Sequence, residues 1–95
     1  MNTLISIIIP SYNEGKTILT ILEKVNKQRT ENIELEVIVI NDGSSDDTDQ
    51  IINENMKYVD IYISLEKNQG KGAAVKKGLE VASGEYILFQ DADLE

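Results

Sequence analysis

The chain has 95 residues, which is enough for one small domain with a modest core. It contains neither Cys nor His, which excludes disulfide frameworks, zinc fingers and thiol or imidazole catalysis, so any metal must be an oxygen-liganded ion such as Mg²⁺, Mn²⁺ or Ca²⁺. A formal net charge of −8 argues against nucleic acid as a partner, and a hydrophobic content of 41% argues against disorder.

The first half of the chain alternates between strand and helix patterns. Residues 4–9 are apolar and β-branched, which predicts a strand. A helix is predicted next, because apolar side chains recur at helical spacing along one face; they are Ile18, Leu19, Ile21, Leu22 and Val25. Residues 35–40 predict a second strand, and the unbroken apolar run within it is typical of a strand buried on both faces.

The second half continues this alternation. A short helix is predicted with Ser44 or Ser45 as its cap, and with an apolar side made of Ile51, Ile52 and Met56. Residues 59–65 then predict a third strand.

A third helix and a fourth strand complete the series. The helix opens at Gly70, runs through Ala82 and ends at Gly84, which we expect to be its C-terminal glycine. Residues 86–89 predict the fourth strand.

The predicted fold class is α/β, with a parallel sheet covered by helices on both faces. Right-handed crossovers favour the strand order 3-2-1-4, which is half of a doubly wound, Rossmann-like sheet. Ligands of such sheets bind beyond the carboxyl ends of the strands, where the strand order reverses. That place lies between the first and fourth strands, next to residues 10–14 and 91–93.

Polar loops follow the first two strands. Tyr12 offers a flat ring for a base and Glu14 offers an acceptor for a base or ribose, although a helix entry capped by Ser11 or Asn13 explains this loop better when it is taken alone. Asp42 ends a buried strand, where a lone carboxylate needs hydrogen-bond donors, and the N–H groups of a nucleobase would supply them. We assign residues 45–48 to helix capping.

Two further polar loops follow the other strands. Gly70 and Lys71 precede a helix in a manner suited to a phosphate, but an ordinary turn explains them equally well. Asp91 and Asp93 stand at i and i+2, which puts both carboxylates on the same side of an extended chain. A divalent cation between them would remove their repulsion and leave positions open for diphosphate oxygens.

These four loops, in this order, resemble glycosyltransferase family 2, whose members have a GT-A fold. The segment 84–95, Gly-Glu-Tyr-Ile-Leu-Phe-Gln-Asp-Ala-Asp-Leu-Glu, is similar to the family's segment around its Asp-x-Asp motif. Its second half resembles the branch that charges polyprenyl phosphates, such as dolichyl-phosphate mannose synthases.

The resemblance implies a role for each matching residue. Pro10, Tyr12 and Glu14 would line the nucleoside pocket, Asp42 would bind the base, Gly70 and Lys71 would border the nucleotide, Asp91 would contact ribose or metal, and Asp93 would hold Mg²⁺ or Mn²⁺. The implied function is binding of a UDP- or GDP-linked sugar and its transfer to an acceptor, here a polyprenyl phosphate.

Family catalytic domains continue well past the Asp-x-Asp motif, so an end at Glu95 indicates a truncated half-domain, spanning residues 1–95, without the acceptor half or the catalytic base. We therefore expect no sugar transfer by this chain alone, while its parent protein is an enzyme. The alternative is an inactive module that binds nucleotide and metal. A nucleotidyltransferase ranks lower, because residues 10–14 replace the Gly-rich, Arg-containing loop of those enzymes.

Location and assembly follow from the same pattern. No apolar run is long enough to span a bilayer and no signal peptide is evident, which predicts a cytoplasmic protein, at the inner membrane surface in a full-length parent. The fourth strand, residues 86–89, forms an apolar edge of the predicted sheet. Such an edge is a template for pairing, so we expect a homo-oligomer through it.

Overall fold

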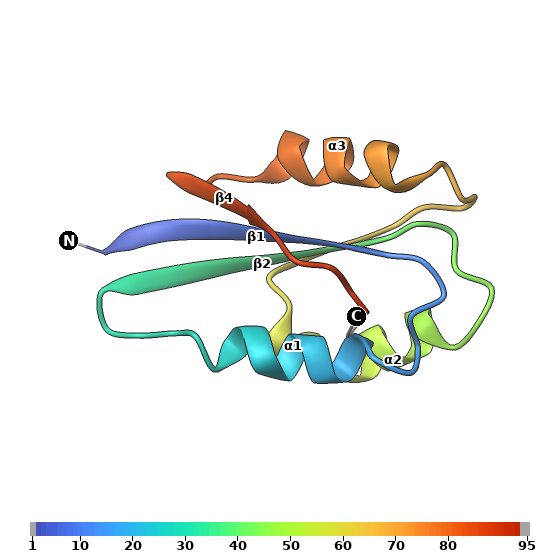
Figure 1. Ribbon diagram of the computed structural model, residues 1–95, viewed down its shortest axis with the longest axis horizontal. Coiled ribbons are helices and arrows are strands. Elements are labelled where there is room, and N and C mark those ends of the chain that lie inside the picture. The colour runs from blue at the N-terminus through green and yellow to red at the C-terminus, as the bar shows by residue number, and fades with distance from the viewer. Residues whose placement is uncertain (1, 94–95) are drawn as a thin grey trace.

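Four parallel strands form one sheet in the order β3-β2-β1-β4, as predicted, in a computed structural model that describes residues 2–93. The elements are β1 (Thr3–Ser11), α1 (Ile18–Asn26), β2 (Ile33–Asn41), α2 (Thr48–Glu54), the 3-10 helix η1 (Met56–Tyr58), β3 (Ile61–Ser64), α3 (Lys71–Val81) and β4 (Tyr86–Phe89). Helix α3 covers one face of the sheet, and α1 and α2 cover the other (Figure 1). Among the described residues no helix is long and apolar enough to cross a bilayer.

The strand register brings the carboxyl ends of the strands to one edge of the sheet. Ser11 at the end of β1 pairs with Asn41 at the end of β2, which in turn pairs with Ser64 at the end of β3. Phe89 of β4 pairs with Ile8, so the chain after β4 passes the last residues of β1. The four loops that carry the predicted site residues therefore start side by side.

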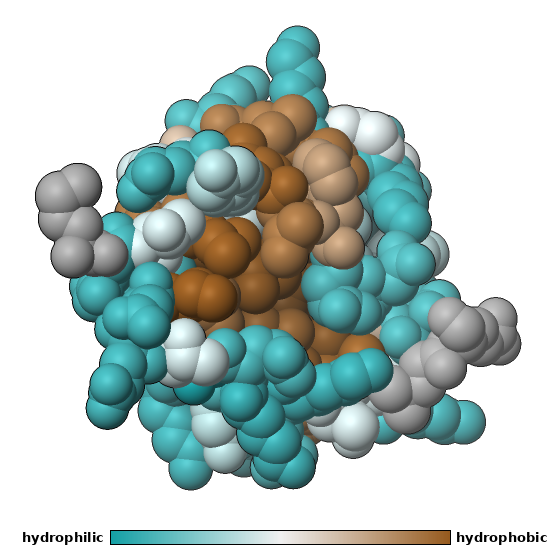
Figure 2. Space-filling view, turned by 60° about the vertical axis from the view of Figure 1, so that its left-hand side comes forward, coloured by the Kyte–Doolittle hydropathy of each residue, from teal (hydrophilic) through white to brown (hydrophobic). Residues whose placement is uncertain are grey.

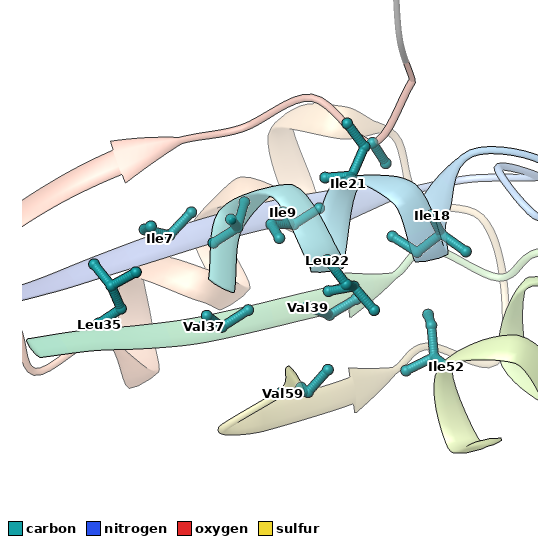
Figure 3. Packing of buried hydrophobic residues seen from close by; sticks show 12 residues of the cluster. Ile7, Ile9, Ile18, Ile21, Leu22, Leu35, Val37, Val39, Ile52 and Val59 are labelled. Atoms are coloured by element: carbon teal, nitrogen blue, oxygen red, sulfur yellow. The ribbon is translucent and has the colours of Figure 1, made fainter. Parts of the chain in front are cut away.

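The two central strands are buried on both faces in their middle, and for β2 the unbroken apolar run predicted this. On one face, side chains of β1, β2, α1 and α2 interlock with Val59; the labelled set is Ile7, Ile9, Ile18, Ile21, Leu22, Leu35, Val37, Val39, Ile52 and Val59 (Figure 3). On the other face, Ile8, Ile38 and Ile40 pack under Ala74 of α3. Full burial of each such branched side chain is worth about 1.5–3 kcal/mol.

The start of the second helix differs from the prediction. Helix α2 begins at Thr48 with Asp47 at its N-cap, and neither Ser44 nor Ser45 caps it. The reason is that Ser44 is engaged elsewhere, because its hydroxyl accepts a hydrogen bond from the backbone N–H of Asn13 in the first loop. The expected apolar side is also shorter, since Met56 lies in η1 and is 39% exposed.

The third strand is shorter than predicted and Gly84 has a different role. Strand β3 spans only Ile61–Ser64, and Val59 turns into the core from the end of η1. Helix α3 ends at Val81 with an extended C-cap at Ala82, so Gly84 does not terminate it. A Cβ on Gly84 would lie 2.6 Å from the backbone nitrogen of Ser6, so this glycine allows a close approach to β1.

A polar cluster fixes the connection from α3 to β4 against the sheet. Glu36 accepts hydrogen bonds from the Ser6 hydroxyl (2.7 Å), the Ser83 hydroxyl (2.7 Å) and the Ser83 backbone N–H (2.9 Å). The Ser6 hydroxyl also accepts from the Gly84 N–H at 2.8 Å. Burial by itself raises the pKa of Glu36, but these hydrogen bonds outweigh it and hold that pKa below its ordinary value.

Strand β4 is an exposed edge of the described sheet. Tyr86, Leu88 and Phe89 are each more than half exposed, at 63%, 54% and 58%. An apolar groove of about 320 Å³ adjoins β4; its lining residues are Ile5, Ile7, Val25, Gln28, Ile33, Leu35, Leu88, Phe89 and Gln90. Figure 2 shows apolar surface in the middle of one face of the molecule, surrounded by polar side chains.

Candidate functional site

An open cavity of about 260 Å³ lies at the carboxyl edge of the sheet, where the strand order reverses between β1 and β4. Its lining residues are Pro10, Ser11, Tyr12, Glu14, Asp42, Asn68, Lys71, Ala74, Asp91, Ala92 and Asp93. Every residue predicted for the site except Gly70 lines this cavity. Four loops that are distant in sequence thus meet around one space, with contributions from both sides of the switch point.

Gly70 is not among the residues that line the cavity, but its backbone contacts Asp42, which is. Its backbone N–H donates to Asp42 Oδ2 at 2.9 Å, next to a donation from Asn68 Nδ2 at 3.1 Å. The backbone N–H of Gln69 donates to Asp42 Oδ1 at 2.7 Å. Asp42 therefore ties the third loop to the end of β2.

These contacts correct the argument that made Asp42 a base-binding residue. That argument required a carboxylate without donors in the protein, whereas Asp42 is only 3% exposed and has three donors. A carboxylate has about four lone-pair sites, so one acceptor position is left for a ligand. Asn68 lines the cavity and was not assigned to the site from the sequence, because no local pattern marks its contact with a residue 26 positions earlier.

The carboxylate of Asp91 is paired with Lys71. Lys71 Nζ lies 2.7 Å from Asp91 Oδ1, and both side chains are well exposed, at 69% and 60%. The hydrogen bond that Lys71 donates to Asp91 and the negative charge of Asp91, with a smaller contribution from the charge of Asp93, raise the pKa of Lys71. Solvent screening weakens an ion pair as open to water as this one, so it can open for a ligand at little cost.

The donor set at Asp91 and Asp93 fits a hard divalent cation only in part. Both carboxylates line the cavity, and carboxylate oxygens are the ligands that Mg²⁺ and Mn²⁺ prefer. Within residues 2–93, however, no group of three or more acidic side chains is placed to hold a metal. The Lys71 ammonium group lies against Asp91, at a position that a metal ion would take. Oxygen atoms of a ligand would have to complete the coordination shell of such an ion.

Ser11 is the second polar residue of the cavity wall, after Asn68, that was not assigned to the site from the sequence. It is 1% exposed, and within the described part of the chain its hydroxyl has no hydrogen-bond partner. A buried hydroxyl without a partner costs about 1–3 kcal/mol, and such groups are uncommon in folded proteins. This hydroxyl lies at the end of β1 and beside the cavity, where a ligand could provide its partner.

The chain matches the family model described as "Glycosyl transferase family 2" over residues 6–95. It belongs to this family. The cavity just described is therefore part of a family 2 domain and lies where β1 and β4 are neighbours in the sheet.

Several relatives of known name are similar to this chain. The poly-β-1,6-N-acetyl-D-glucosamine synthase of Staphylococcus epidermidis is 43% identical over 90 residues, which cover 94% of this chain and 21% of that protein. The chain thus spans about a fifth of the length of this relative. Dolichyl-phosphate β-glucosyltransferases, including the human enzyme, also occur among the relatives.

Solved structures of glycosyltransferases share the fold. S. aureus TarS 1–349 in complex with UDP-GlcNAc superposes with a TM-score of 0.84 at 36% identity, over 98% of this chain and 27% of that one. The mannosyltransferase PcManGT from Pyrobaculum calidifontis, in complex with GDP-Man and Mn²⁺, has a TM-score of 0.84 at 26% identity, over 98% of this chain and 28% of that one. The family 2 fold is therefore present here in its Rossmann-like part.

Proposed function

We propose that this chain is the nucleotide-sugar-binding part of a metal-dependent glycosyltransferase. The observation that carries the proposal is the cavity at the switch point, because it joins the predicted residues of four separate loops. Structural neighbours with bound UDP-GlcNAc or GDP-Man support the same class of ligand.

By the chemistry of their side chains, we divide the residues around the cavity into two groups, one for each half of a nucleoside diphosphate. Pro10, Tyr12, Glu14 and Asp42 form one group, with a flat ring and acceptors for N–H and hydroxyl groups. We assign the base and ribose to it, with the remaining acceptor position of Asp42 directed to the base. Lys71 and the two carboxylates after β4 form the other group, which we call the diphosphate end and assign to the diphosphate.

At the diphosphate end, Asp91 and Asp93 would hold Mg²⁺ or Mn²⁺. When bound, the ion supplies charge neutralisation for the diphosphate that leaves as the bond to the sugar breaks. Lys71 would then leave Asp91 and place its ammonium group beside the phosphates. The protein carries a formal net charge of −8, so cations at this end offset the repulsion between an acidic protein and an anionic ligand.

We assign a polyprenyl phosphate as the acceptor of this transferase. The resemblance of residues 90–95 to that branch and the dolichyl-phosphate relatives support this choice. The alternative remains a module that binds nucleotide and metal without catalysis. Turnover of a nucleotide sugar with a polyprenyl phosphate by the purified chain favours the transferase, whereas tight nucleotide binding without turnover favours the module.

The metal assignment predicts the result of a calorimetric titration. UDP or GDP should bind at least tenfold more tightly in the presence of Mn²⁺ than with excess chelator, because an ion held by Asp91 and Asp93 would offset the negative charge of the diphosphate. Asp93→Ala should remove this difference, while Asp49→Ala on α2, away from the cavity, should retain it. Equal affinities with Mn²⁺ and with chelator in the wild-type chain would contradict the metal role.

We also propose that two copies of the chain associate through β4. Its exposed residues carry no charge, and antiparallel pairing of β4 with its own copy would close the assembly about a two-fold axis. Leu88→Lys should convert a dimer to a monomer in sedimentation experiments, because it puts a charge into the shared sheet. The Leu88 side chain is 54% exposed, so the fold itself tolerates this change. Ser64→Lys on the opposite edge serves as the control, and an unchanged sedimentation coefficient for Leu88→Lys would refute the association.

A further inference from the structure

The first and second loops, residues 12–17 and 42–47, are joined by a hydrogen-bonded network that we call the loop latch. Its side chains are those of Asn13, Ser44, Asp46 and Thr48. The bonds link residues 31 to 34 positions apart, so they connect two loops rather than complete one helix cap. None of these four residues lines the cavity, but their neighbours Tyr12, Glu14 and Asp42 do.

Asn13 is the centre of the latch. Its backbone adopts a left-handed conformation, with φ of 52°, which few residues other than Gly and Asn tolerate well. Its N–H donates to the Ser44 hydroxyl at 2.9 Å, and its side-chain oxygen accepts from the backbone N–H groups of Ser45 at 2.8 Å and Asp46 at 3.3 Å. The conformation and the contacts together fix the chain between Tyr12 and Glu14.

Asp46 and Thr48 close the latch from the other side. The Asp46 carboxylate accepts from the backbone N–H of Gly15 at 3.1 Å and of Thr48 at 3.0 Å, and also from the Thr48 hydroxyl. The Thr48 hydroxyl in turn accepts from the Glu14 N–H at 3.0 Å. The backbone N–H groups of Asn13, Glu14 and Gly15 are therefore all hydrogen-bonded to side chains of the latch.

We propose that Asn13 and Asp46 are positioning residues for nucleoside recognition, which fix Tyr12 and Glu14 opposite Asp42 before a ligand arrives. This inference rests on the proposed nucleotide-binding function. Tyr12 is 46% exposed, so packing alone does not hold its ring, and the latch supplies the constraint through the backbone. A loop ordered in advance avoids the entropic cost of ordering it on binding.

The test compares nucleotide binding with binding of a ligand that lacks the nucleoside. Asn13→Gly keeps the left-handed backbone accessible and removes only the side-chain amide. We expect this variant to bind UDP or GDP, whichever the wild type prefers, about tenfold more weakly in the presence of Mn²⁺. Its affinity for Mn²⁺ with inorganic pyrophosphate should be unchanged, because pyrophosphate reaches only the diphosphate end.

A matched control separates positioning from a general loss of stability. Asp60 also accepts a backbone N–H bond, from Val37 at 2.7 Å, and it pairs with Arg29, but it lies at the opposite end of the sheet. Asp60→Asn should lower the melting temperature without weakening nucleotide binding. Asp46→Asn removes one acceptor oxygen from the latch and should behave like Asn13→Gly.

Each outcome decides the inference. Wild-type nucleotide affinity in Asn13→Gly overturns it, and so does an equal loss of nucleotide and pyrophosphate affinity. If the wild-type chain binds neither UDP nor GDP, the proposed function itself fails. Amide hydrogen exchange then tests the latch independently, since exchange at Glu14 and Gly15 should quicken in Asn13→Gly, and unchanged exchange there overturns the latch as well.

Discussion

Gly43→Ala should destabilise this protein by about 3 kcal/mol or more, through both backbone strain and overpacking. Gly43 has a positive φ of 68°, where an added Cβ is unfavourable. That Cβ would also lie 2.3 Å from the backbone nitrogen of Asn68 and 2.4 Å from the carbonyl carbon of Lys67. The clash is with backbone, which cannot turn aside as a side chain can. The third loop would have to move and release the bonds that it makes with Asp42.

Two other glycines provide a graded comparison in urea unfolding. Gly70 has a positive φ of 98° but open space around it, so Gly70→Ala should cost only the backbone strain, about 1–2 kcal/mol. Gly72 lies within α3, has open space and has no positive φ, so Gly72→Ala should be neutral or stabilising by up to about 1 kcal/mol. A Gly43→Ala variant as stable as Gly72→Ala would show that the second and third loops are not in contact.

Glu36→Gln should destabilise the protein by about 2 kcal/mol at pH 7, because hydrogen bonds to a charged acceptor are worth more than those to a neutral one. Glu36 receives three hydrogen bonds, two of them from Ser83, and the amide of Gln retains only one acceptor oxygen. Glu34 on the same strand is exposed and accepts a single bond from Asn2, so Glu34→Gln should change stability by less than about 0.5 kcal/mol.

The effect of Glu36→Gln should depend on pH in a defined direction. The pKa of Glu36 is lowered in the folded protein, so its charged form contributes stability above the unfolded-state pKa of about 4.3. That contribution is lost as the pH falls through the folded-state pKa. The difference between wild type and Glu36→Gln should therefore be full at neutral pH and shrink in acid. A difference that is constant from pH 7 to acid pH would contradict the role of the charge.

Sequence periodicity, together with general rules of chain topology, was sufficient to predict the fold. The unbroken apolar run at residues 37–40 indicated a strand buried on both faces, and residues 4–9 indicated another strand; these are the two central strands. The helical spacing from Ile18 to Val25 gave the face that packs on the sheet. Chirality rules then fixed the strand order, and with it the place where the loops meet. Each of these signals is local in sequence or general to the fold class.

The predictions that were wrong concern contacts between residues that are distant in the sequence. Asp42 was expected to lack donors, but the loop 68–70 provides them. Ser44 was expected to cap a helix, but it binds Asn13 of the first loop. Gly84 was expected to end a helix, but it lets the chain approach Ser6 closely. A Ser before a helix or a Gly after one carries the same local signal in either case, so sequence alone does not distinguish the two roles.

The strand order affects how the protein folds while it is being synthesised. Strand β1 is synthesised first, yet it completes its pairing only when β4 appears about 80 residues later. At roughly 5–20 residues per second, the nascent chain on the ribosome waits for roughly 4–16 seconds with one side of β1 unpaired. Residues 5–8 stay unpaired on that side throughout this time, and an unpaired, largely apolar strand edge is prone to aggregation.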